Sequence, residues 1–271
     1  MQYVSLHNHT TFCDGDDSME DFVRYVIADG GSAIGFSGHS HQSYEQDYTM
    51  TKESEKEYCA EIDRLREKFG DRIRIYKGIE LEYFCDSDIT PYEYIIGSVH
   101  LVKKDGIYIG VDSAKEEVCQ SVREIYGGNW MAYVRDYYET VIRSASRPCV
   151  DIVGHFDLVT KFNEGQNLFS EESPEYLSAA IGALEELRKE DKIYEMNTGA
   201  ISRGYRTAPY IGSKEILRYM CEHGMRMTVN ADAHQKENYR FRFAETAAVL
   251  KEAGFQEIWE YNGKEFEPAG L

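Results

Sequence analysis

The stretch that decides the fold is Tyr3–His9, which reads YVSLHNH and continues as TTFCDG over residues 10–15. We predict a β-strand here, and the side chains of a strand alternate between its two faces. His7 and His9 would then point the same way and hold one metal ion between them, with Asp14 a short loop further on. Two histidines so close together are more often incidental surface residues. The hypothesis therefore depends on matching ligands at other strand ends.

Matching ligands do recur, each directly after a short apolar run. The candidate strand ends read Gly38-His39-Ser40, Gly78-Ile79-Glu80, Gly97-Ser98-Val99-His100, Gly154-His155-Phe156-Asp157 and Asn230-Ala231-Asp232-Ala233-His234. With His7 and His9, six of the eight histidines lie at such positions, where a barrel enzyme builds its site. A single histidine is usually a structural residue, but six at corresponding positions favour a shared metal site.

Strand-like and helical patterns alternate along the chain, which is typical of an α/β barrel. Helical spacing occurs over residues 19–28 (with Ser18 as N-cap), 51–69, 131–142, 174–189, 214–223 and 245–253, and strands are predicted over 33–37, 72–78, 94–99, 150–153, 193–196 and 225–230, with a hairpin around Asn262-Gly263. Residues 101–130 lack a sustained period and are expected to form a long irregular excursion over the barrel mouth, such as a lid. Without an internal repeat or linker, residues 1–271 are expected to form one domain.

The composition excludes several classes of protein. The chain has 271 residues, of which 42% are hydrophobic, enough for a sizeable core. Its 30 basic and 48 acidic residues give a net charge of -18, so nucleic-acid binding is not expected. No apolar run could span a bilayer, no signal-like segment precedes the first strand, and the six cysteines form no C-x-x-C pair. We therefore expect a cytoplasmic protein with reduced thiols and no membrane partner.

The candidate metal ligands comprise six histidines and three carboxylates. They are His7, His9, Asp14, His39, Glu80, His100, His155, Asp232 and His234. Nine ligands are too many for one ion, but with a bridging carboxylate they suffice for two to three divalent ions, with Zn, Mn and Fe as candidates. Such ions lower the pKa of a bridging water and hold a phosphoryl oxygen during in-line displacement. Glu80 is expected to face the cations, whereas Glu82 is expected at a solvated rim position.

Three basic residues near predicted strand ends are candidates for binding substrate phosphate. Arg203 and Arg206 lie in the loop after the strand 193–196, and Lys161 lies beyond the strand 150–153. A guanidinium group matches phosphate oxygens in a bidentate way, although surface arginines are more often simply solvated. We rank Arg203 first because two glycines flank it and let the backbone turn inward, with Lys161 second and Arg206 third.

These motifs, in this order and over nearly the whole chain, resemble the polymerase and histidinol phosphatase (PHP) family of metallophosphoesterases. The segments that look most like the stand-alone L-histidinol-phosphate phosphatases are Gly97-Ser98-Val99-His100, an insert with Gly127-Gly128-Asn129 and Tyr137-Tyr138, and Gly154-His155-Phe156-Asp157-Leu158. The resemblance implies a distorted (β/α)7 TIM-like barrel. It also implies a trinuclear metal site at the C-terminal ends of the strands.

The resemblance further implies a reaction and an assignment of ligands. A metal-bridging hydroxide would attack L-histidinol phosphate and yield L-histidinol and phosphate, a step of histidine biosynthesis. The first ion would take His7, His9, Glu80 and Asp232, the second Glu80, His100 and His155, and the third Asp14, His39 and His234. The expected catalytic residues are Glu80, Asp232, His234 and Arg203. Asp14 stands where many relatives have a histidine, so the third site departs from the family pattern.

Two alternative functions are weighed against this one. The same metal core suits a PHP-family phosphoesterase acting on another small phosphorylated metabolite or on nucleotides. The net charge and the lack of a basic or aromatic strand-binding stretch disfavour polynucleotides. A metal-binding or regulatory protein without turnover is disfavoured because purely structural metal sites are closed four-ligand cages. The expected partner is thus a small phosphorylated substrate.

Overall fold

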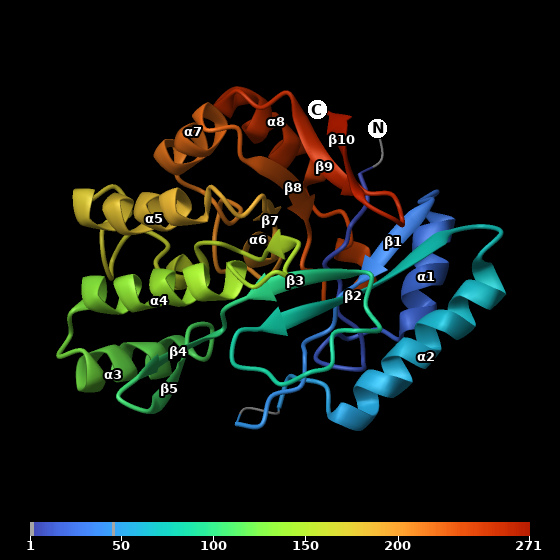
Figure 1. Ribbon diagram of the computed structural model, residues 1–271, viewed down its shortest axis with the longest axis horizontal. Helices are drawn as coiled ribbons and strands as arrows, with labels where there is room; N and C mark the ends of the chain where they lie inside the picture. Colours follow the sequence, from blue (N-terminus) through green and yellow to red (C-terminus); the bar gives the residue numbers. More distant parts are fainter. Residues whose placement is uncertain (1–2, 45–46) are drawn as a thin grey trace.

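Six parallel strands form the centre of the computed structural model, which describes residues 3–44 and 47–271 (Figure 1). Across the sheet they follow the order β1 (Ala33–Phe36), β2 (Arg74–Glu82), β3 (Tyr94–Ser98), β6 (Ile152–Val153), β7 (Ile193–Asn197) and β8 (Arg226–Asn230). Every neighbouring pair is parallel, and the sheet curls into a half-barrel. All six strands were predicted, although β2 continues beyond Gly78 to Glu82.

The predicted first strand, Tyr3–His9, is an extended segment rather than a regular strand. It lies between the two edges of the sheet. On one side Gly35 N in β1 donates to Ser5 O at 2.9 Å, and on the other His9 N donates to Ala233 O beyond β8 at 2.8 Å. The segment thereby links the first and last strands of the sheet and closes a distorted barrel. The predicted TIM-like (β/α)7 class is confirmed.

The side chain of Asn8 explains why this closing segment is irregular. Its Nδ2 donates to Ser5 O at 3.1 Å and to Gly35 O at 2.7 Å, so it uses acceptors that a regular ladder would fill with backbone N–H groups. Asn8 is fully buried and forms an isolated parallel bridge with Ala233. The amide side chain of Asn8 thus replaces part of the backbone hydrogen bonding of a regular strand. The alternation of polar and apolar residues in the sequence does not reveal this replacement.

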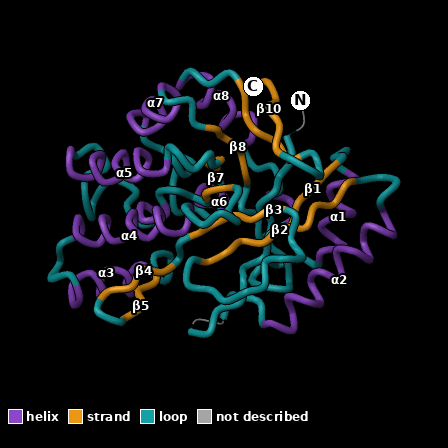
Figure 2. Tube along the Cα trace, viewed as in Figure 1, coloured by secondary structure: helices purple, strands orange, loops and turns teal. Residues whose placement is uncertain are grey.

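Helices surround the strands on the outside of the barrel (Figures 1 and 2). They are α1 (Met19–Ala28), α2 (Lys52–Phe69), α4 (Trp130–Ala145), α5 (Pro174–Leu187), α7 (Lys214–Glu222) and α8 (Phe243–Ala253). These helices match the predicted ones except for small shifts at their ends. The predicted N-cap of α1 is confirmed, because the Ser18 hydroxyl accepts a hydrogen bond from Asp21 N.

Residues 101–130 contain more regular structure than predicted. β4 (Leu101–Lys104) and β5 (Ile107–Gly110) form an antiparallel hairpin, and α3 (Lys115–Ile125) follows it. The turn of the hairpin has positive φ angles at Asp105 (50°) and Gly106 (85°), as two-residue turns require. The prediction of an irregular excursion was wrong. The strands are too short, and α3 buries too few apolar residues, to give a sustained period.

The remaining elements are short. They are η1 (Leu158–Thr160), α6 (Gly199–Ser202), η2 (Lys236–Asn238) and the C-terminal hairpin of β9 (Glu257–Tyr261) and β10 (Phe266–Gly270). The hairpin confirms the turn predicted around Asn262-Gly263. Within the described ranges, no helix combines the length and apolar character needed to cross a membrane.

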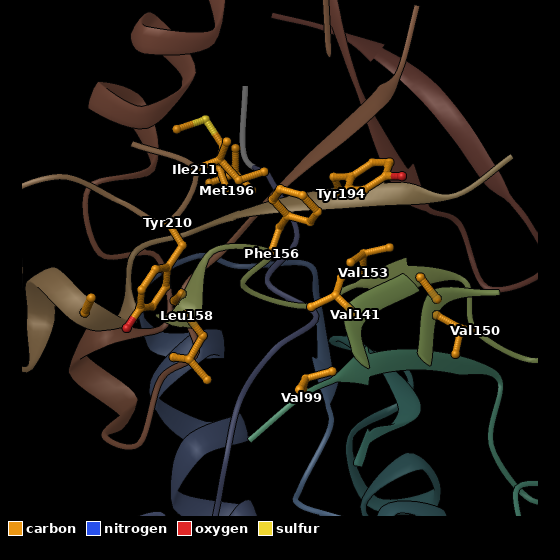
Figure 3. Packing of buried hydrophobic residues seen from close by; sticks show 14 of the residues in the cluster. Val99, Val141, Val150, Val153, Phe156, Leu158, Tyr194, Met196, Tyr210 and Ile211 are labelled. Carbon is orange, nitrogen blue, oxygen red and sulfur yellow. The ribbon is translucent and has the colours of Figure 1, made fainter. Parts of the chain in front are cut away.

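Buried side chains pack tightly around β6 and β7 (Figure 3). Phe156 lies edge-on to Tyr194 of β7, with 6.0 Å between the ring centroids, and both side chains are buried. The hydroxyl of Tyr137 in α4 lies 3.3 Å from His155 O and 3.2 Å from Phe156 O. Packing on Phe156 and hydrogen bonding to its backbone therefore fix the position of the adjacent His155.

Tyr94 links three elements inside the barrel. Its hydroxyl lies 2.5 Å from Leu6 O in the closing segment and 3.0 Å from Phe36 O in β1, and both carbonyls can accept its hydrogen bond. Its ring passes over Gly78 of β2, where an added Cβ would lie only 2.2 Å from a ring carbon. The close approach of the ring therefore requires glycine at position 78.

We expect Gly78→Ala to lower the free energy of unfolding by about 1–3 kcal/mol, because the strand and the Tyr94 ring must move apart. The matched control is Gly182→Ala in α5, where an added Cβ meets no atom within 4 Å and alanine favours the helix. Chemical denaturation of both variants provides the measurement. Wild-type stability of Gly78→Ala would contradict this packing.

Candidate metal centre

All nine predicted ligands converge at the C-terminal ends of the strands. The closing segment supplies His7 and His9, the loop after it Asp14, the end of β2 Glu80, and the loops after β1, β3, β6 and β8 supply His39, His100, His155, Asp232 and His234. The residues predicted from strand ends are therefore neighbours in space. Their side-chain N and O atoms fall into three groups.

The first group contains His7, His9, Glu80 and Asp232. Nε2 of His7 lies 3.3 Å from Glu80 Oε2, and Nε2 of His9 lies 3.2 Å from Asp232 Oδ1. The two crossed distances are 3.5 Å (His9 to Glu80) and 3.7 Å (His7 to Asp232). Metal–ligand bonds of about 2.0–2.2 Å in a tetrahedron separate the ligand atoms by about 3.3–3.6 Å. The group therefore has the dimensions of a metal site.

Three buried atoms of this first group also lack ordinary partners. Nε2 of His7, Nε2 of His9 and Oε2 of Glu80 make no hydrogen bond to any atom of the described residues. Buried polar atoms in native proteins are nearly always satisfied by protein, water or an ion. Two buried nitrogen atoms that are left unsatisfied within 3.5 Å of an unsatisfied carboxylate oxygen fit a divalent cation.

The second group uses the other oxygen of Glu80. Glu80 Oε1 lies 2.9 Å from His155 Nε2 and 3.3 Å from His100 Nε2. One carboxylate thus faces two sets of imidazoles with different oxygens. Glu80 could therefore be shared by two ligand groups.

The third group is centred on Asp14. Its Oδ2 lies 3.1 Å from His234 Nε2, and its Oδ1 lies 3.6 Å from His39 Nε2 and 3.5 Å from His9 Nδ1. His39 also reaches the first group, because its Nδ1 lies 2.9 Å from Glu80 Oε2. The side chain of Asp14 is 30% exposed, so the third group is the one nearest to solvent.

A cavity of about 270 Å³ opens over these groups. Its walls include Asp112 and Ser113 from the segment between β5 and α3, Lys161 after η1, Arg203 at the end of α6, and Tyr205. Residues 101–130 therefore contribute to the mouth of the barrel as predicted, and they do so through the irregular connection between β5 and α3. Two of the three predicted phosphate-binding cations line the cavity.

Arg203 lies at the wall of the cavity and pairs with a candidate ligand. Its Nη2 donates to Asp232 Oδ2 at 2.9 Å, and its Nη1 lies 2.8 Å from His234 Nδ1. The guanidinium is therefore held beside the metal groups. Arg203 can contact a phosphate in the cavity from this position.

Arg206, the third predicted phosphate ligand, does not line the cavity. Its Nη1 and Nη2 donate to the two carboxylate oxygens of Glu171 at 2.7 and 2.9 Å, and Nη1 also donates to Thr160 O at 2.7 Å. These bonds tie the loop after α6 to η1 and to the segment that follows it. The sequence alone could not separate this structural arginine from Arg203.

The family model described as "PHP domain" matches residues 5–199. The chain belongs to the PHP domain family. A Schizosaccharomyces pombe protein named "Probable histidinol-phosphatase" is 25% identical over 282 residues, which covers 94% of this chain and 88% of that protein. A Lactococcus lactis protein named "Histidinol-phosphatase" is 23% identical over 290 residues, covering 98% and 97%. The predicted family is confirmed.

Solved structures show the same fold. The crystal structure of a histidinol phosphate phosphatase from Lactococcus lactis, complexed with Zn, L-histidinol and phosphate, has a TM-score of 0.64 and 20% identity and covers 98% of both chains. A structure from Listeria monocytogenes assigned as the histidinol phosphatase hisK has a TM-score of 0.72 and 16% identity, and covers 89% of this chain and 99% of that one. The PHP barrel is thus shared at low sequence identity.

The PHP domain of this chain also contains a buried carboxylate that sequence reasoning missed. Glu195 lies in the middle of β7 and is fully buried. Its two oxygens lie 3.1 and 3.0 Å from His7 Nδ1, and they accept hydrogen bonds from His155 N at 2.8 Å and Asn230 Nδ2 at 2.9 Å. A carboxylate on Nδ1 fixes the orientation of the His7 ring and directs Nε2 at the first group. An acidic residue within the apolar run IYEMN was the available signal.

Glu82 corrects a second expectation, because it is not a solvated rim residue. Its side chain is only 2% exposed. Glu82 Oε2 accepts from His100 N at 2.7 Å and lies 3.2 Å from His100 Nδ1. The period of two along β2 places Glu82 on the same face as Glu80, and the loop after β3 covers it. Glu82 thus orients His100 as Glu195 orients His7.

The electrostatics of the PHP site keep its carboxylates ionised. Burial acts to raise the pKa of Glu80, but the charges of nearby histidines, led by His7 and His39, hold that pKa well below its usual value. For Asp232 burial also acts upward, and Arg203 is the main group that holds its pKa well below the usual range. Buried anions of this kind require cations as partners.

The imidazole of His9 is held neutral in the same site. Burial, reinforced by the neighbouring charges of His234 and His39, lowers the pKa of His9 to about 3. The His9 ring stacks on His234, with 4.3 Å between the ring centroids. A neutral imidazole has a free lone pair, which is the state in which histidine binds a metal.

Proposed function

We propose that this PHP domain is a metal-dependent phosphomonoester hydrolase that converts L-histidinol phosphate and water to L-histidinol and phosphate. The observation that carries the proposal is the combination of three ligand groups, two of which share Glu80, with a cavity walled by Arg203 and Lys161. Curated relatives named as histidinol-phosphatases support the substrate, since they align over almost their whole length. We further infer that residues 1–271 form one domain and that the protein acts in the cytoplasm.

The ligand groups fit two to three divalent ions, with zinc as our first candidate. His7, His9, Glu80 and Asp232 would hold one ion, Glu80, His100 and His155 a second, and Asp14, His39 and His234 a third. The unsatisfied buried atoms of His7, His9 and Glu80 support this assignment. Bound divalent ions would lower the pKa of water and offset the charge of the phosphoryl oxygens.

The residues of the chain itself would bind and orient the substrate. Arg203 carries more donors than its bonds to Asp232 and His234 use, and these can reach phosphate oxygens in the cavity. Lys161 Nζ lies on the cavity wall, so its charge can complement the phosphate from another direction. Two cations that contact the phosphate from different directions would restrict its rotation and so favour in-line attack.

Two observations favour a small ester over a polynucleotide. The cavity over the ligand groups has a volume of about 270 Å³, which suits a small metabolite. The chain carries a net charge of -18, which repels a polyanion at a distance. A short phosphate ester can enter the cavity, where bound divalent ions would supply positive charge, without bringing further negative charge near the surface.

We expect purified protein to contain two to three first-row divalent ions per chain and to release phosphate from L-histidinol phosphate. Chelation should remove both the metal and the activity, and added Zn or Mn should restore both. Metal analysis of each preparation, alongside a phosphate-release assay, is the measurement. Less than one ion per chain with activity that survives exhaustive chelation would refute the proposal.

Glu80→Gln is expected to be among the most damaging single changes. It removes the charge that is shared by two groups, so we expect activity to fall by more than about a hundredfold and metal content to drop. Glu57→Gln, an exposed residue of α2, is a control with the same change of side chain. Assays of phosphate release and metal content compare the two. Near-normal turnover and full metal content in Glu80→Gln would mean that Glu80 does not bridge.

Arg203→Ala and Arg206→Ala should have opposite effects. We expect Arg203→Ala to lower kcat/KM by about tenfold to a thousandfold, because a bidentate phosphate contact is lost. Arg206→Ala should keep kcat/KM close to wild type but lower the free energy of unfolding by about 1–3 kcal/mol, because Glu171 loses its cationic partner. Kinetics, metal content and denaturation separate the cases. Loss of metal from Arg203→Ala would instead assign Arg203 to supporting Asp232.

A further inference from the structure

Asp112 and Lys161 form a pair at the wall of the cavity. Lys161 Nζ lies 3.6 Å from Asp112 Oδ2 and donates to Asp112 O at 3.1 Å. Lys161 is 7% exposed, whereas the side chain of Asp112 remains 31% exposed. Asp112 lies between β5 and α3, and Lys161 follows η1, so two separate segments of the chain bring these charges together.

The pair also lines a second cavity that adjoins the first. This second cavity has a volume of about 700 Å³, and Asp112, Ser113, Lys161 and Tyr205 line both cavities. The shared lining makes the second cavity the outward extension of the first. A phosphate ester held over the metal groups would therefore direct its organic part past Asp112.

We propose that Asp112 is the specificity-determining residue that binds an ammonium group next to the ester, so that the site selects phosphate esters of 2-amino alcohols. The proposal rests on the proposed function and names the substrate class of the same site. In such an ester the ammonium nitrogen and the ester oxygen are carried by adjacent carbon atoms. The phosphate of such a substrate complements Lys161, and its neighbouring ammonium group complements Asp112.

The existing pair explains how the two charges of the substrate would be used together. When phosphate enters, Lys161 can turn from Asp112 to the phosphate, and the substrate ammonium can replace Lys161 at Asp112. One ion pair is exchanged for two. With an ester that lacks the ammonium group, Asp112 would be left without a cation in a partly desolvated wall, which disfavours binding.

Other carboxylates near the cavity are less suited to this role. Of the acidic residues that line the first cavity, Asp14 and Asp232 belong to the metal groups, which leaves Asp112. Glu116 and Glu164 line only the second cavity and are exposed, and Glu164 already accepts hydrogen bonds from Thr207. Asp112 is therefore the carboxylate placed beside both the phosphate and the start of the leaving group.

The test compares two substrates on metal-loaded protein. L-histidinol phosphate carries the ammonium group, and imidazolylpropyl phosphate is the same ester without it. We expect wild type to prefer the first by at least about tenfold in kcat/KM, and Asp112→Asn to lose most of this preference, with a loss of about tenfold to a hundredfold confined to the aminated ester. The control Glu117→Gln, exposed in α3 and outside both cavities, should keep it.

The outcomes separate this proposal from the proposed function. Phosphate release from neither ester by wild type would overturn both. Release from both esters without preference, or an equal loss on both esters in Asp112→Asn, would overturn the role of Asp112 alone. Metal content and circular dichroism show whether Asp112→Asn is intact. If Asp112→Asn does not fold, Asp112→Glu replaces it as the test variant, because the longer side chain displaces the carboxylate. An unchanged preference of Asp112→Glu for the aminated ester would overturn the proposal.

Discussion

The architecture depends on the burial of one carboxylate. Glu80 is 1% exposed, and its two oxygens lie within 3.5 Å of five imidazoles, those of His7, His9, His39, His100 and His155. A carboxylate buried to this degree is strongly destabilising unless cations surround it. No single loop can supply five imidazoles around one point. The converging ends of barrel strands can do so, because each strand end contributes one or two side chains. The barrel fold therefore brings together the imidazoles that the burial of Glu80 requires.

The closing segment shows how the chain satisfies this constraint where regular structure ends. Asn8 uses its side chain in place of ladder bonds, so the segment bends between β1 and β8 while it presents the residues on either side of Asn8 to Glu80. Behind the ligands, Glu195 and Glu82 accept from the Nδ1 side of two histidines and so fix which nitrogen faces inward. The irregular backbone and the buried carboxylates of Glu195 and Glu82 both serve to direct histidine nitrogens toward Glu80.

The sequence revealed the residues that converge in the three groups but not the residues that orient them. Side chains at strand ends are recognisable because the apolar run, the glycine and the ligand lie together along the chain, as in Gly78-Ile79-Glu80. Glu195 lies inside a strand, and its role depends on which residues of other strands face it, information that no local pattern contains. The burial of Glu82 depends on the loop after β3 in the same way. Arg203 and Arg206 share one loop, and only the position of Glu171 decides that one of them is structural.

Strand ends and connecting segments build different parts of the cavity. The floor of the cavity is built by strand ends, which are fixed by the sheet and place charges for any phosphate ester. The walls are built by connections, with Asp112 carried by the β5–α3 segment and Lys161 by the turn after η1. Connections can change length and composition without disturbing the sheet. In a PHP barrel with a common metal floor, discrimination among leaving groups must therefore arise in these connections. We propose that, in this chain, the connection between β5 and α3 that carries Asp112 makes that discrimination.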